Sequence, residues 1–80
     1  MSLVRNTIHK RDIEDYFYDT TGIFLSRMQT AECRRDDNGN VTMIRLETPM
    51  GQMKCYEWSQ ARILREAISV YAPRVIVEEK

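Results

Sequence analysis

The sequence is poor in the residues that mark several classes of small protein. Its 80 residues include two cysteines, one histidine, three glycines and two prolines. Secreted domains of this size usually carry several disulfide bonds, so two cysteines argue against that class. Two cysteines with one histidine and no Cys-x-x-Cys pair give no basis for a structural zinc site. The few glycines and prolines exclude a collagen-like or low-complexity chain.

An excess of one charge and long apolar runs are also missing. Twelve basic residues balance twelve acidic ones, so the chain lacks the basic excess typical of nucleic-acid-binding domains. No apolar run approaches the roughly 20 residues that span a bilayer, and residues 1–5 lack the apolar stretch of a signal peptide. We therefore expect a cytoplasmic protein that does not associate with membranes.

The pattern that remains predicts one small α+β domain. Eighty residues leave no room for a second core, so residues 1–80 are expected to form a single domain, with residues 1–6 as a flexible N-terminus. Apolar spacing and turn signals predict helices over 7–19 and 60–71 and strands over 23–35, 41–48, 52–58 and 74–79. The order α-β-β-β-α-β favours an antiparallel sheet with both helices packed on one face.

Both helices are expected to turn an apolar stripe toward this sheet. In the first, Thr7 is the expected N-cap and Gly22 the stop signal. Its stripe consists of Ile13, Tyr16 and Phe17. In the second, Ser59 is the expected N-cap and Pro73 ends the helix. Its expected core residues are Ala61, Leu64, Ala67, Ile68 and Tyr71, with Ile63 and Val70 widening the stripe.

The first hairpin has a well-specified register. Asn38-Gly39 between two strand-like runs predicts a type I′ turn, in which both central residues have positive φ. Pairing back from this turn places Glu32 opposite Arg45 as a cross-strand ion pair. The expected inner residues are Ala31, Cys33, Ile44 and Leu46, and the outer ones are Thr30, Glu32, Arg34, Met43, Arg45 and Glu47. A slip by one residue would bury these charges.

Two registers remain open for the second hairpin, whose turn covers residues 48–51. A two-residue loop turns Met53 and Cys55 toward the core. In that register the outer face gains Lys54 and Tyr56. A type I turn with Gly51 as a bulge shifts the pairing by one residue and brings Tyr56 and Trp58 to the core instead. We favour the first register because it keeps a lysine out of the core.

The chain carries no pattern of residues typical of catalysis. It has no phosphate-binding glycine loop, no nucleophile motif and no metal-ligand motif. His9 stands beside two basic residues and is expected to face solvent, and Cys33 and Cys55 are expected to be buried free thiols. We therefore predict a protein that is not an enzyme and that uses no cofactor or metal.

The outer face of the sheet is the predicted binding surface. The expected partner-binding residues are Arg34, Met43, Arg45, Lys54 and Tyr56. Methionine and arginine are enriched at protein interfaces. This set favours a protein partner, of which a second copy of the chain is the simplest case, and the chain would act as an adaptor, inhibitor or accessory subunit. The alternative is RNA or DNA, bound by the arginines with Tyr56 stacking on a base.

The order of elements over about residues 7–72 resembles the double-stranded-RNA-binding domain. The resemblance is one of topology. That family has a basic stretch at the start of its second helix, where this chain has Ser59-Gln60-Ala61-Arg62. It also has a Gly-Pro-x-His signature in its first hairpin loop, where this chain has Asp37-Asn38-Gly39-Asn40. The residues with which that family contacts RNA are therefore missing here.

Overall fold

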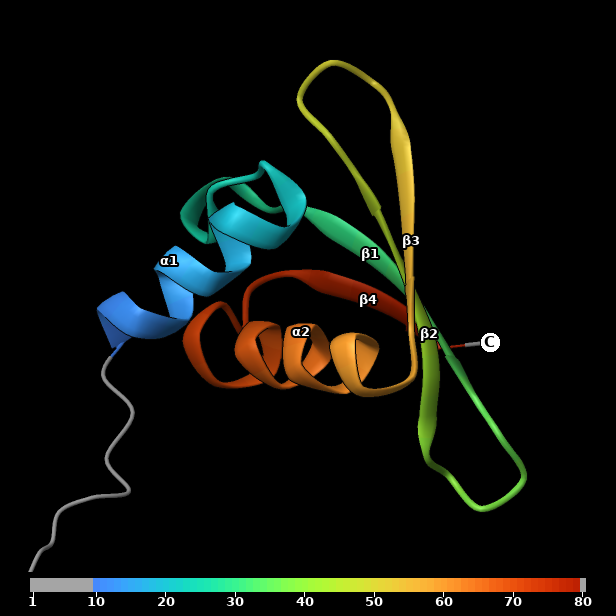
Figure 1. Ribbon diagram of the computed structural model, residues 1–80. Helices are drawn as coiled ribbons and strands as arrows, with labels where there is room; N and C mark the ends of the chain where they lie inside the picture. Colours follow the sequence, from blue (N-terminus) through green and yellow to red (C-terminus); the bar gives the residue numbers. More distant parts are fainter. Residues whose placement is uncertain (1–9, 80) are drawn as a thin grey trace, which may run out of the picture.

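Two helices cover one face of a four-stranded sheet and leave the other face open (Figure 1). The computed structural model describes residues 10–79. Its elements are α1 (Lys10–Thr21), the 3-10 turn η1 (Leu25–Arg27), β1 (Thr30–Arg35), β2 (Val41–Glu47), β3 (Met53–Glu57), α2 (Trp58–Tyr71) and β4 (Ile76–Glu79). The predicted α+β order is confirmed. The strand order is β3-β2-β1-β4, and β1 pairs with β4 in parallel, whereas the other pairs are antiparallel as expected.

Helix α1 ends at the predicted stop signal, although it continues two residues beyond the expected end at residue 19. Gly22 has a positive φ of 75°, and its N–H donates to the carbonyl of Tyr18 at 2.7 Å, which ends the helix in a left-handed residue. Phe17 is buried, and Ile13 and Tyr16 pack against the core. The expected start at residue 7, with its cap, lies outside the described residues. Within residues 10–79, neither helix has the length and apolarity that a membrane crossing requires.

The strand predicted over residues 23–35 begins only at Thr30. The preceding segment is irregular but well packed, and its buried side chains are Ile23, Leu25 and Met28. Its backbone forms the 3-10 turn η1 instead of a strand, and Arg74 binds several of its carbonyls. The guanidinium of Arg74 donates to the carbonyls of Leu25, Ser26 and Met28. The side chain of Arg74 thus donates hydrogen bonds to backbone carbonyls that a neighbouring strand would otherwise bind.

The register of the first hairpin is confirmed, although its turn differs from the prediction. Ala31, Glu32, Cys33 and Arg34 face Leu46, Arg45, Ile44 and Met43, in that order. The N–H of Gly39 donates to the carbonyl of Asp36 at 3.0 Å, and Gly39, with φ of 85°, is the turn residue in the left-handed region. This is a type I turn followed by a glycine bulge, not a type I′ turn. A second irregularity leaves Thr42 unpaired in β2 and restores the predicted pairs.

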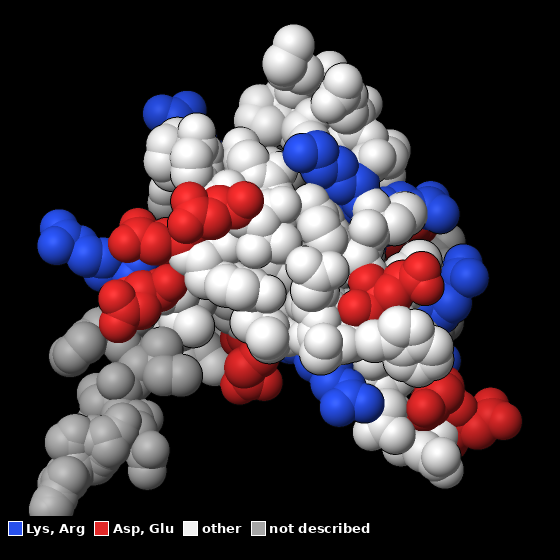
Figure 2. Space-filling model, viewed as in Figure 1, with Lys and Arg blue, Asp and Glu red and all other residues white. Residues whose placement is uncertain are grey.

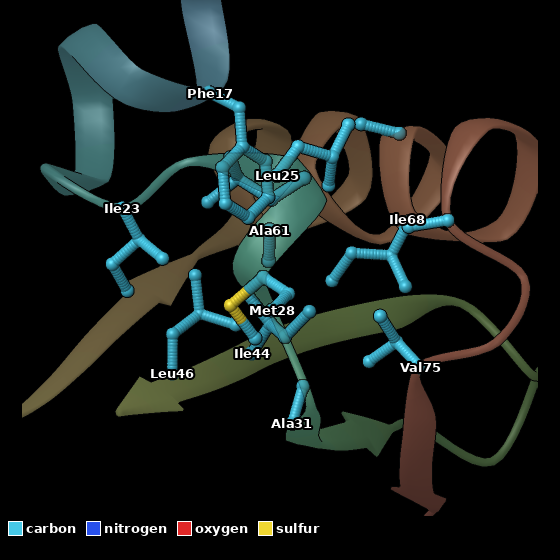
Figure 3. Packing of buried hydrophobic residues seen from close by; sticks show 13 residues of the cluster. Phe17, Ile23, Leu25, Met28, Ala31, Ile44, Leu46, Ala61, Ile68 and Val75 are labelled. Carbon is cyan, nitrogen blue, oxygen red and sulfur yellow. The ribbon is translucent and has the colours of Figure 1, made fainter. Parts of the chain in front are cut away.

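Helix α2 contributes Ala61, Leu64, Ala67 and Ile68 to the core. The buried cluster consists of Phe17, Ile23, Leu25, Met28, Ala31, Ile44, Leu46, Ala61, Leu64, Ala67, Ile68, Ala72 and Val75, most of which are seen in Figure 3. The predicted stripe is confirmed, with Tyr71 partly buried at its end, but Ile63 and Val70 are exposed. The helix begins before Ser59, and no side chain caps it. Trp58 turns the chain from strand to helix with a φ of 55°, so there is no loop between them.

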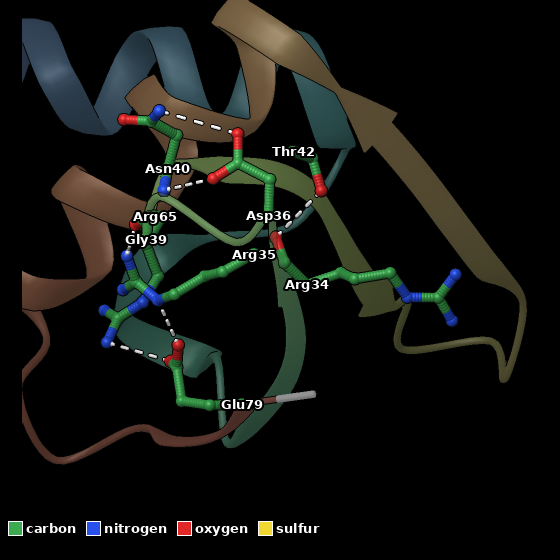
Figure 4. Close-up of polar contacts among 8 residues, drawn as sticks. All are labelled: Arg34, Arg35, Asp36, Gly39, Asn40, Thr42, Arg65 and Glu79. Carbon is green, nitrogen blue, oxygen red and sulfur yellow. Dashed lines mark hydrogen bonds and ion pairs between the residues drawn. The ribbon is translucent and has the colours of Figure 1, made fainter.

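An ion-pair cluster ties β4 to the rest of the sheet (Figure 4). Glu79 Oε1 lies 2.6 Å from Arg35 Nε on β1, and its Oε2 lies 3.4 Å from Arg65 Nη2 on α2. The hydrogen bond from Arg35, followed by the charges of both arginines, lowers the pKa of Glu79. The cluster is partly solvent-exposed, so its contribution is modest, but it joins three elements at one carboxylate.

Leu64→Ala is expected to lower the free energy of unfolding by about 2–5 kcal/mol, because Leu64 is fully buried and its removal leaves a cavity. The matched control is Ile63→Ala, one position along the same helix but exposed, with an expected change of about 0.5 kcal/mol or less. Urea denaturation measures both. Equal losses would mean that the helix faces the sheet differently.

Glu79→Gln is expected to be most destabilising near neutral pH. A carboxyl whose pKa is lowered on folding stabilises the native state above its unfolded pKa of about 4.3, and the effect is lost as the pH falls through the lower folded pKa. The stability gap between wild type and variant should therefore narrow on acidification. Urea titrations across this range test it, with Glu78→Gln as the control. A gap independent of pH would contradict the cluster.

Candidate protein-interaction face

The pairing of β2 with β3 decides which side chains face outward. Ile44 faces Tyr56, Arg45 faces Cys55 and Leu46 faces Lys54. This is the second of the two registers, so the one that the sequence favoured is wrong. The N–H of Gly51, whose φ is 85°, donates to the carbonyl of Thr48 at 2.9 Å, as a type I turn with a glycine bulge requires.

Lys54 and Tyr56 consequently lie on the inner face, under the end of α1, and not on the predicted binding surface. Lys54 Nζ donates to the carbonyl of Thr21 at 3.3 Å, and the Tyr56 hydroxyl donates to the carbonyl of Thr20 at 3.0 Å. Carbonyls in the last turn of a helix have no partner within it, so these two donors satisfy groups that would otherwise be unpaired. Burial raises the pKa of Tyr56. Trp58, which this register was expected to bury, is 63% exposed.

We define the open face as the side chains that point away from the helices. They form three rows across the sheet, running from β3 to β4. The first row is Met53, Glu47, Thr30 and Ile76; the second is Cys55, Arg45, Glu32 and Glu78; the third is Glu57, Met43 and Arg34. Of the predicted partner-binding residues, Arg34, Met43 and Arg45 therefore lie together on this face.

A shallow hollow of about 250 Å³ lies between two apolar side chains of the first row. Met53 on β3 is 54% exposed and Ile76 on β4 is 66% exposed, and both line it. Its other lining side chains include Thr30, Glu32, Arg45, Glu47 and Glu78. Arg45 Nη1 lies 3.0 Å from Glu32 Oε1, so the predicted cross-strand ion pair is present at the edge of this hollow.

Among residues 10–79, the open face carries more negative than positive charge. Its carboxylates are Glu32, Glu47, Glu57 and Glu78, and its guanidinium groups are Arg34 and Arg45. Figure 2 shows acidic and basic side chains close together on the sheet side of the molecule, at the right of the view, with a separate acidic group over α1 at the left. Because four of these six charges are negative, the surface would repel the phosphate groups of a nucleic acid.

Sequence reasoning missed Met53, Cys55 and Ile76 as members of this face. The first two belong to it only in the register that was not favoured. Ile76 joins the face because β4 pairs in parallel with β1, with Ile76 beside Thr30. No local sequence signal marks that pairing, since its partners are separated by both hairpins and a helix.

Other parts of the described chain offer no comparable surface. A larger hollow of about 490 Å³ lies between residues 26–30 and 47–49, but Arg74 in its wall is already engaged by backbone carbonyls. Within residues 10–79, no three His, Cys, Asp or Glu side chains are grouped to hold a metal ion. His9 lies outside the described residues. Cys33 is buried, which raises the pKa of its thiol, whereas Cys55 is exposed.

The two thiols are expected to react at very different rates with a disulfide reagent such as DTNB. Cys55 on the open face should be modified at once, and Cys33 only as fast as the protein unfolds, because a buried thiol is neither accessible nor readily deprotonated. Cys55→Ser and Cys33→Ser assign the two phases. Two slow thiols would indicate that Cys55 faces the core and that the register is wrong.

Comparisons of the chain with protein-family models, with curated proteins and with solved structures found no match, so the function must be argued from the open face itself.

Proposed function

We propose that this protein is a small non-enzymatic binding domain that engages a protein partner through its open face. The observation that carries the proposal is the hollow walled by Met53 and Ile76 on a sheet face that no described element covers. Apolar side chains set among charged ones are typical of a protein interface, with an apolar centre and a polar rim. The expected location in the cytoplasm stays a prediction from the sequence.

The apolar residues of the face suit contact with another protein. Met53 and Met43 are unbranched and adapt to the shape of a partner. Ile76 is more exposed than Met53, so much of its apolar surface is available for burial. Because exposed apolar groups gain free energy only when covered, they supply the attraction, and the surrounding charges select the partner.

Charge favours a different protein over a second copy of the chain. Two copies stacked face to face would bring two negative surfaces together, since each open face has four carboxylates and two guanidinium groups. A partner with a basic surface avoids this repulsion. The same charge disfavours RNA and DNA, and both Lys54 and Tyr56, which were to contact them, point to the inner face.

The test is affinity capture from the source cells with three versions of the protein. Met53→Lys should reduce recovery of the specific partner about tenfold or more, because it places a charge where apolar contact is expected. The matched control is Met50→Lys, the same substitution in the turn of the same hairpin, where Met50 is 87% exposed and outside the face. Met50→Lys should leave capture unchanged.

Three outcomes would contradict the proposal or its assignment of the partner as a different protein. Equal recovery with Met53→Lys and wild type would show that the open face is not the interface. A dimer in light scattering that dissociates in Met53→Lys would make the partner a second copy. Tight, salt-sensitive gel shifts with mixed RNA and DNA would make it a nucleic acid, since phosphate contacts weaken as salt rises.

A further inference from the structure

We infer that the hollow in the open face receives a lysine or arginine side chain of the partner, and that apolar residues of the partner flank this side chain. The inference rests on the proposed function and names the chemistry by which the partner is recognised. It follows from the combination of exposed apolar side chains and carboxylates that line one small space.

The walls of the hollow fit the stem of a long side chain. Met53 and Ile76 stand in the same row on the two outer strands, so their backbones are about 14 Å apart at roughly 4.8 Å per strand spacing. Between them, the volume of about 250 Å³ would hold roughly eight water molecules at about 30 Å³ each. The aliphatic stem of lysine or arginine buries apolar surface in such a space while its charged end reaches polar groups.

The carboxylates that line the hollow fit a cation. Three carboxylates line it, those of Glu32, Glu47 and Glu78, against the single guanidinium of Arg45. Arg45 is paired with Glu32, and neither Glu47 nor Glu78 takes part in an ion pair with any residue of the described chain. The hollow therefore has an excess of negative charge, which a basic side chain would balance.

Charged groups on every neighbouring strand agree with this assignment. On β3 the nearest acidic side chain is Glu57, in the third row, and Lys54 points to the opposite face. Arg34 on β1 also lies in the third row, away from the hollow. Among the basic groups of residues 10–79, the nearest is thus Arg45, whose charge Glu32 already offsets.

The spread of the carboxylates distinguishes a side chain from a bare metal ion. Within residues 10–79, no three of them are close enough to share a metal. An anionic lipid surface is disfavoured too, because the face itself is negative. A ligand that carries its charge on an apolar stem satisfies both the apolar walls and the carboxylates.

The experiment uses a displayed library of random short peptides, selected on the wild-type protein and counter-selected on Met53→Lys. Peptides that survive should be enriched in lysine or arginine flanked by apolar residues. Glu47→Lys should weaken the selected peptides about tenfold or more, since an attractive charge becomes a repulsive one. The matched control is Glu66→Lys, the same change at an exposed position on α2, which should leave affinity unchanged.

A charge swap then distinguishes a direct contact between the basic residue of the peptide and Glu47 from a general weakening of peptide binding. When the basic residue of a selected peptide is replaced by glutamate, the peptide should bind Glu47→Lys better than wild type. Spermidine, which has cationic charge without flanking apolar side chains, should compete poorly.

Surviving peptides that are acidic or lack basic residues would overturn the inference and leave the proposed protein interface standing. Survivors that bind Glu47→Lys as well as wild type would do the same. No survivors would overturn the inference, and no survivors together with a partner captured equally by Met53→Lys would overturn the proposed function as well.

Discussion

The carbonyl groups at the end of α1 need donors, and β3 supplies them. Lys54 and Tyr56 donate to Thr21 and Thr20, and α1 has no basic residue in its own last turn. A cation at this end also interacts favourably with the helix dipole. Because both donors must face the helix, the pairing of β3 is fixed, and with it the choice of Met53 and Cys55 as outward residues. The composition of the open face is thus set by contacts on the opposite face.

Placing a lysine under the helix has a second effect on the sheet. β3 is an edge strand, and exposed edges can pair with other chains. A charged residue that points inward from such an edge is one of the devices by which proteins avoid this pairing, and a strand of only five residues is another. The ammonium group of Lys54 meanwhile reaches the carbonyl of Thr21. Met53 and Cys55 consequently stay exposed on the outward face, and the edge is protected.

Local patterns predicted the fold, and distant contacts decided the site. The order of elements and the core of α2 follow from apolar spacing, and the first register follows from alternation, although the turn type was wrong. The predicted register is nevertheless present, because the unpaired Thr42 in β2 compensates for the extra residue in the turn. The second register depends on contacts with carbonyls of α1, which is far away in the sequence. The irregular segment before β1 depends on contacts with Arg74. The position of Ile76 depends on the parallel pairing of β4 with β1. None of these contacts leaves a periodic signal in the sequence.

Because β4 is held by a single parallel pairing, the part of the open face that it carries can unfold separately from the rest of the sheet. β4 has four residues and is bonded along one side only, so it can detach without separating β1, β2 and β3. Detachment would remove Ile76, one wall of the hollow, and expose the partly buried Val77. If the open face binds a partner as proposed, only the fraction of molecules in which β4 is docked would be competent to bind, and the apparent affinity would fall in proportion to that fraction. A partner that contacts Ile76 would in turn hold the strand in place, so binding and the local order of β4 are thermodynamically coupled.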